Sequence, residues 1–80
     1  MTGVAWAVLI VYARTLPAGP DRRKVSGCLR AGAPSKMGQD LARVVIARSG
    51  LTHRGQLTAK GQHAARVFLA LHGLPLPGPL

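Results

Sequence analysis

The chain has 80 residues, of which 48% are hydrophobic, and its eleven Lys and Arg against two Asp and Glu give a formal net charge of +9. This length allows one small domain, and such a charge favours a polyanionic partner: DNA, RNA, an anionic membrane surface or an acidic protein. With only Asp21 and Asp40 available, a paired-carboxylate catalytic site is disfavoured, and we predict no enzymatic activity.

The first predicted element is a helix over residues 4–16. Its run from Val4 to Ala13 carries no charge, but it is shorter than the ~20 residues that a membrane-spanning helix needs. No basic segment precedes it and Arg14 follows it directly, so it does not resemble a signal peptide. We predict a buried core helix, with a buried strand as the alternative, and no membrane association. The single Cys28 cannot form an internal disulfide, which indicates a reducing, cytoplasmic location.

A second helix is predicted over 22–30, after the turn 17–20. Asp21 is placed to cap it, because its carboxylate can accept hydrogen bonds from the first backbone N–H groups. Val25, Cys28 and Leu29 recur at helical spacing and are expected to face the core.

A third helix is predicted over 36–49, with Ser35 as its N-cap. Met37, Leu41 and Val44 with Val45 recur at helical spacing, so this side is expected to face the core. Lys36, Gln39 and Arg43 would then lie on the outer side. Gly50 is expected to end the helix, because a positive φ costs glycine nothing.

A small hairpin over 51–57 and a last helix over 59–71 complete the domain. Leu51 and Leu57 are expected to fix the base of the hairpin to the core, and Thr58 to cap the helix. The apolar side of this helix is expected to be Ala64, Val67, Phe68 and Leu71. We assign residues 1–73 to a single domain and residues 74–80 to a mobile, Pro-rich tail.

Two short motifs resemble a known family. Ala47-Arg48-Ser49-Gly50-Leu51 is similar to the end of the recognition helix in winged helix-turn-helix proteins, and Leu57-Thr58-Ala59-Lys60-Gly61 is similar to the "LTxxG" that follows the wing in MarR-like regulators. The resemblance spans roughly residues 21–71. It implies a mainly α fold of four helices with a two-stranded wing. It also implies binding of double-stranded DNA, with segment 35–49 in the major groove and wing 51–57 at the backbone or minor groove.

The side chains on these segments have the chemistry that DNA contact requires. Gln39 could pair with adenine, Lys36 or Arg43 with guanine, and Arg54 could enter a narrow minor groove. Arg22, Arg23 and Lys24 suit phosphates. The candidate DNA-binding residues are Arg22, Arg23, Lys24, Ser35, Lys36, Gln39, Arg43, His53, Arg54, Gln56 and Lys60.

The leading hypothesis from the sequence is therefore a small homodimeric transcriptional regulator, such as a repressor. Its dimer interface is expected to hold the most apolar residues of the first and last helices: Trp6, Leu9, Ile10, Val67, Phe68 and Leu71. One alternative is a protein-interaction module that inhibits or redirects an acidic nucleic-acid enzyme or regulator. Another is RNA or ribosome binding, which the scarcity of aromatic residues disfavours. Because Cys28 and the three histidines lack the close spacing of a structural zinc site, we predict no metal and no cofactor.

Overall fold

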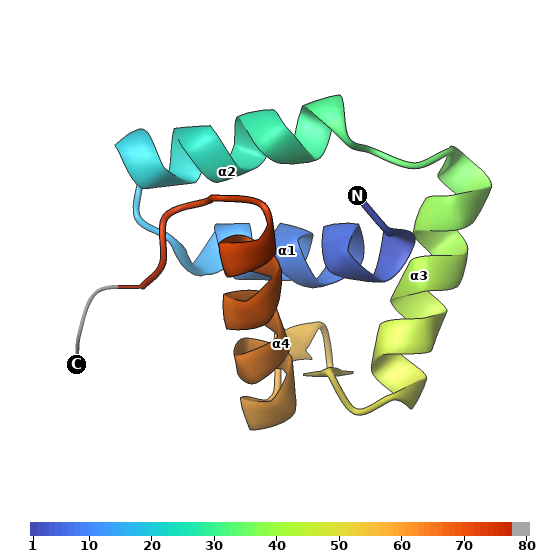
Figure 1. Cartoon of the computed structure of the whole chain (residues 1–80). Coiled ribbons are helices and arrows are strands. Elements are labelled where there is room, and N and C mark those ends of the chain that lie inside the picture. The colour runs from blue at the N-terminus through green and yellow to red at the C-terminus, as the bar shows by residue number, and fades with distance from the viewer. Residues whose placement is uncertain (78–80) are drawn as a thin grey trace.

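The computed structural model describes residues 1–77, which form four helices and one two-stranded antiparallel sheet (Figure 1). The elements are α1 (Gly3–Thr15), α2 (Pro20–Ala31), α3 (Lys36–Arg48), β1 (Thr52–His53), β2 (Gln56–Leu57) and α4 (Ala59–Leu71). The predicted order, four helices with a small hairpin before the last, is confirmed. Within residues 1–77, no helix combines the length and apolar character required to cross a bilayer.

Helix α1 lies at the centre of the fold. It contacts α2, α3, α4 and β2; α2 runs back alongside it, and α3 lies across its N-terminal end (Figure 1). Because three helices surround α1, Trp6 is only 5% exposed and Leu9 is fully buried. The prediction that these two residues form a dimer interface is therefore wrong, since they belong to the core of the single chain. Ile10 is partly buried against the same core.

Side-chain caps begin two of the helices as predicted. The Ser35 hydroxyl accepts a hydrogen bond from the Gly38 N–H, and the Thr58 hydroxyl accepts one from the Gly61 N–H, at 3.2 and 3.1 Å. Helix α2 differs from the prediction, because its N-cap is Gly19 and Pro20 is its first residue. The fixed φ of proline suits this first position, so Asp21 lies inside the first turn.

Helix α3 packs against α1 through the side opposite to the predicted one. Ala42 and Ile46 are buried, whereas the side with Met37, Leu41, Val44 and Val45 is exposed. The approach is close at Ala42, whose side chain is small: a Cβ built on Gly3 of α1 would lie 3.5 Å from the Cβ of Ala42. Both sides of α3 carry apolar residues, and α3 buries the side with Ala42 and Ile46.

The hairpin pairs Thr52 with Leu57 and His53 with Gln56. Arg54 and Gly55 have φ of 52° and 77°, and positive φ at both central residues defines a type I′ turn. The base of the hairpin is attached to the core as predicted, with Leu51 buried and Leu57 partly buried.

Helix α4 buries Gly61, Ala65 and Leu69, with Ala64 and Phe68 partly buried beside them. Val67 and Leu71 are exposed, so the predicted apolar side of this helix is rotated relative to the real one. Leu74 is buried, and its N–H donates to the Leu69 carbonyl at 2.9 Å. The packed domain thus extends past residue 73, and residues 78–80 of the predicted mobile tail lie outside the described residues.

Candidate functional site

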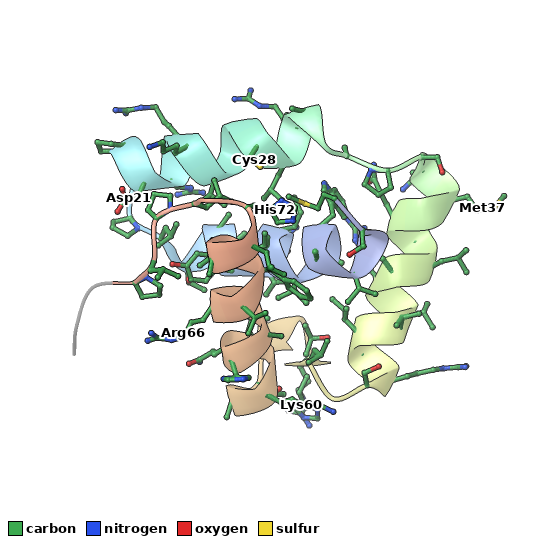
Figure 2. All side chains as sticks on the ribbon, viewed as in Figure 1. Asp21, Cys28, Met37, Lys60, Arg66 and His72 are labelled. Carbon is green, nitrogen blue, oxygen red and sulfur yellow. The ribbon has the colours of Figure 1, made fainter. Side chains whose placement is uncertain are left out.

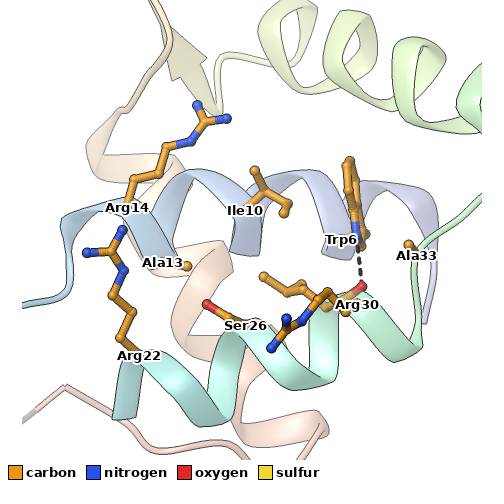
Figure 3. Close-up of a pocket in the computed structure, with 9 residues that line it drawn as sticks. Trp6, Ile10, Ala13, Arg14, Arg22, Ser26, Arg30 and Ala33 are labelled. Carbon is orange, nitrogen blue, oxygen red and sulfur yellow. Dashed lines mark hydrogen bonds between the residues drawn. The ribbon is translucent and has the colours of Figure 1, made fainter. Parts of the chain in front are cut away.

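A groove between α1 and α2 combines an apolar floor with a cationic rim (Figure 3). Trp6, Ile10, Ala13 and Leu29 form the floor, and the groove has a volume of about 460 Å³. Its rim carries Arg14 from α1 and Arg22 and Arg30 from α2, and we call it the arginine groove. An apolar surface bordered by guanidinium groups can hold an anionic partner and exclude water from the contact.

Helix geometry brings these arginines together. Residues four apart lie on the same side of a helix, so Arg22, Ser26 and Arg30 follow one line along α2, next to the buried Leu29. Arg14, in the last turn of α1, also lines the groove, and in Figure 3 its side chain extends from α1 away from α2. The only salt bridge among residues 1–77 joins Lys36 to Asp40 at 3.4 Å. The rim therefore carries three positive charges without a carboxylate partner.

Trp6 connects the groove to α3. Its indole N–H donates to the Leu29 carbonyl at 3.2 Å, which holds the ring against α2. The Arg43 guanidinium lies 5.9 Å from the ring centroid, a cation–π distance. Arg43 is exposed, and its guanidinium is directed towards the Trp6 ring.

A second hollow, of about 710 Å³, joins the end of α1 to the hairpin and α4. Arg14 and Arg66 line it together with Tyr12 and the hairpin residues Gly55 and Gln56. Burial raises the pKa of the Tyr12 phenol; the positive charge of Arg66 opposes this rise, and Asp21 adds to it. Arg14 borders both hollows, so the arginine groove continues as a cationic band towards the hairpin.

Three arginines of this band were not among the predicted site residues: Arg14, Arg30 and Arg66. The spacing of Arg22, Ser26 and Arg30 at i, i+4 and i+8 is a sequence signal that could have identified Arg30. Arg14 and Arg66 come from opposite ends of the chain, and only the tertiary fold brings them together.

The predicted reading residues of α3 do not form an open polar surface. Gln39 is partly buried, and its side-chain N–H donates to the Pro34 carbonyl at 3.0 Å. Lys36 is paired with Asp40, and the Ser35 hydroxyl caps the helix. Of the residues expected on the outer side of α3, Lys36 and Arg43 are exposed as predicted, whereas Gln39 is partly buried because α3 packs through the side next to it.

The other predicted site residues are exposed but lie in separate places. Arg22, Arg23 and Lys24 lie on α2, and His53, Arg54 and Gln56 lie on the hairpin. Lys60 extends from the start of α4, and its ammonium donates to the Ser49 carbonyl at 2.9 Å. In Figure 2, Met37 points away from the molecule on α3, whereas Lys60 and Arg66 extend from α4.

Cys28 and the three histidines do not assemble into a site. Within the described part of the chain, no group of three or more His, Cys, Asp or Glu side chains is placed to hold a metal ion. Cys28 is a partly buried free thiol at the edge of the core.

Comparisons with protein-family models, curated proteins and solved structures find no match for this chain. The arginine groove and its cationic extension are the surface whose chemistry points most directly to a ligand.

Proposed function

We propose that this chain binds double-stranded DNA through the phosphate backbone, with the arginine groove as its main contact and little preference for sequence. The observation that carries the proposal is the convergence of Arg14, Arg22 and Arg30 on one groove without a carboxylate partner among residues 1–77.

Backbone binding fits the chemistry and spacing of these side chains. Guanidinium groups can bind phosphate oxygens through two parallel hydrogen bonds. Arg22 and Arg30 are eight residues apart, which corresponds to about 12 Å along α2. They can therefore reach separate phosphates, while Arg14 approaches from α1.

The state of α3 supports binding without base readout. Direct readout needs polar side chains free to reach base edges. The Gln39 side chain donates a hydrogen bond to the Pro34 carbonyl, and the Arg43 guanidinium lies at a cation–π distance from Trp6. The outward side of α3 is apolar. We therefore do not assign α3 the role of a reading helix, and regulation at a defined operator is not part of the proposal.

The hairpin supports a second backbone contact. In a winged helix-turn-helix arrangement it would be the wing, which lies beside the DNA backbone. Arg54 at its tip has a φ of 52°, a conformation that costs an arginine more than a glycine or asparagine. A cation held at this position despite that cost supports a role in contact with an anion.

The test compares Arg30→Ala with Lys24→Ala, two variants of α2 that each remove one exposed positive charge. Binding to a labelled duplex is measured over a range of salt concentrations. Arg30→Ala is expected to reduce the slope of log K against log[salt] by about 0.9 and to weaken binding about eightfold near 0.1 M salt. Lys24→Ala, outside the groove, is expected to have a smaller effect.

Two results would contradict the proposal. Equal losses in both variants would show that total charge acts without a defined site. Strong enrichment of one sequence from a random pool of duplexes would refute the absence of sequence preference.

A second candidate function is favoured by the apolar floor of the arginine groove, which a phosphate backbone does not use. An acidic protein segment with an apolar side chain would use both floor and rim. Ile10→Ala removes apolar surface from the floor of the groove and leaves the charge unchanged. It should therefore weaken binding of such a segment and leave duplex binding intact. Trp6 is the single tryptophan and lines the groove, so its fluorescence reports occupation in both titrations.

A further inference from the structure

We infer that two copies of this chain associate through the outward side of α3. Four large apolar side chains, Met37, Leu41, Val44 and Val45, form this surface, which we call the α3 stripe. Met37 is 74% exposed, Leu41 61% and Val44 50%, which is unusual for side chains of this size in a domain with a well-filled core.

The α3 stripe has the form of a helix-pairing surface. Positions 37, 41, 44 and 48 alternate steps of four and three residues, the spacing that places side chains along one line facing a second helix. A shallow hollow of about 540 Å³ lies on the stripe, lined by Lys36, Met37, Asp40, Leu41 and Val44. An apolar side chain from a facing helix can insert there, as a knob inserts into a hole.

Charge favours a second copy over an acidic partner at this surface. Asp40, one of only two carboxylates in a chain of net charge +9, borders the α3 stripe. Lys36 beside it is already paired with that carboxylate, and Arg43 is turned to Trp6. The repulsion between two basic copies is reduced where a carboxylate is present. An acidic partner would be drawn instead to the arginine groove.

An antiparallel pair of α3 helices makes these charges complementary. With Val44 on the two-fold axis, Asp40 and Arg48 lie four residues to either side, about 6 Å from the axis. Asp40 of one copy is then level with Arg48 of the other, and two-fold symmetry repeats the pair. Arg48 has no carboxylate partner among residues 1–77 of the single chain, and the second copy supplies one.

The size of the contact sets the strength of association. Helix α3 has 13 residues and a length of about 20 Å, and one side of it is smaller than the ~800 Å² per partner of a standard interface. The dissociation constant of the dimer should therefore be micromolar or higher. It requires no DNA, so its test is separate from that of the proposed function.

The experiment is sedimentation equilibrium of the full chain without nucleic acid, from about 5 to about 500 μM. The 8.4 kDa chain is expected to change from monomer to dimer over this range. Val44→Gln should weaken the dimer at least about tenfold. Val67→Gln on α4 is the matched control, because Val67 is 44% exposed and lies outside the stripe, and it should leave association unchanged. Circular dichroism verifies that both variants keep the fold.

A charge exchange tests the antiparallel arrangement. Arg48→Asp should weaken the dimer because it faces Asp40 of the second copy, and the double variant Asp40→Arg, Arg48→Asp should restore association. A monomer at every concentration, or a dimer that Val44→Gln leaves intact, would overturn the inference. If Val67→Gln weakened the dimer as much as Val44→Gln, the α3 stripe would not be the specific contact, and the inference would be overturned as well. Failure of the charge exchange to restore association would refute the antiparallel pairing.

Discussion

Gly61 is the position where a single methyl group should have the largest effect on this fold. Helix α4 passes so close to the base of the hairpin that a Cβ on Gly61 would overlap the carbonyl oxygen of Leu51. It would also lie 2.9 Å from the Leu51 carbonyl carbon and 3.0 Å from Cδ2 of Leu57. The Leu51 atoms belong to the backbone, so they cannot rotate away as a side chain would. Gly61→Ala must therefore displace α4 from the hairpin.

The expected change in the free energy of unfolding of Gly61→Ala combines three contributions. Alanine in place of glycine in a helix stabilises by up to about 1 kcal/mol. Overpacking costs about 1–3 kcal/mol. The Leu51 carbonyl also accepts a hydrogen bond from the Thr58 N–H at 3.1 Å, and disturbing this bond costs a further ~1 kcal/mol. The net loss is about 2 kcal/mol, which lowers the melting temperature of a domain of this size by about 10 °C.

Gly27→Ala is the matched control. Gly27 lies inside α2, and a Cβ there would meet no atom within 4 Å. This variant should gain about 0.5–1 kcal/mol and melt a few degrees above wild type. Thermal unfolding of the three proteins, followed by far-ultraviolet circular dichroism, measures both effects. A Gly61→Ala protein as stable as wild type would refute the close approach of α4 to the hairpin.

The hairpin tip and Tyr12 provide two further predictions. Arg54→Asn should increase the free energy of unfolding by about 0.5–1 kcal/mol, because asparagine tolerates positive φ better than arginine; urea unfolding measures it, and a loss of stability would argue against strain at the tip. Burial raises the pKa of Tyr12, so the folded state holds the phenolic proton more tightly than the unfolded state does. Stability should therefore fall as the pH rises above about 10, and less so in Tyr12→Phe. Urea unfolding at about pH 9 and about pH 11 measures the loss of stability in wild type and in Tyr12→Phe. Equal losses in the two proteins would contradict a contribution from Tyr12.

Local chemistry was sufficient to predict where α3 and α4 begin and where α3 ends. Ser35 and Thr58 cap the helices that they were expected to cap, and Gly50 has the positive φ expected after α3. Each of these features depends on neighbouring residues, so the sequence carries the whole signal. The prediction that Asp21 caps α2 was wrong, because Pro20 is the first helical residue and Asp21 therefore lies inside the first turn.

Tertiary packing decided what periodicity could not. Helix α3 offers Met37 and Leu41 on one side and Ala42 and Ile46 on the other, and both sides have helical spacing. The spacing of Met37, Leu41, Val44 and Val45 suggested the core side, but α1 approaches α3 where Ala42 meets Gly3. This contact joins residues far apart in the chain, and it left the apolar side of α3 that was predicted to face the core exposed instead.

The prediction of a buried core helix for α1 is confirmed. Local patterns did not show how completely its side chains are enclosed, so Trp6 and Leu9 were also assigned to a dimer contact. Trp6 and Leu9 became core residues because α2, α3 and α4 all pack around α1. For the same reason, Arg14 and Arg66 could not be recognised as neighbours from the sequence.

The central position of α1 has a consequence for how the chain folds during synthesis. Helix α1 leaves the ribosome before any of its partners, and α4, which covers it, is made last. Until then the uncharged run from Val4 to Ala13 has no complete set of partners in its own chain. An unfinished chain therefore exposes an apolar run that can aggregate, and protection during translation would matter more to this protein than its small size suggests.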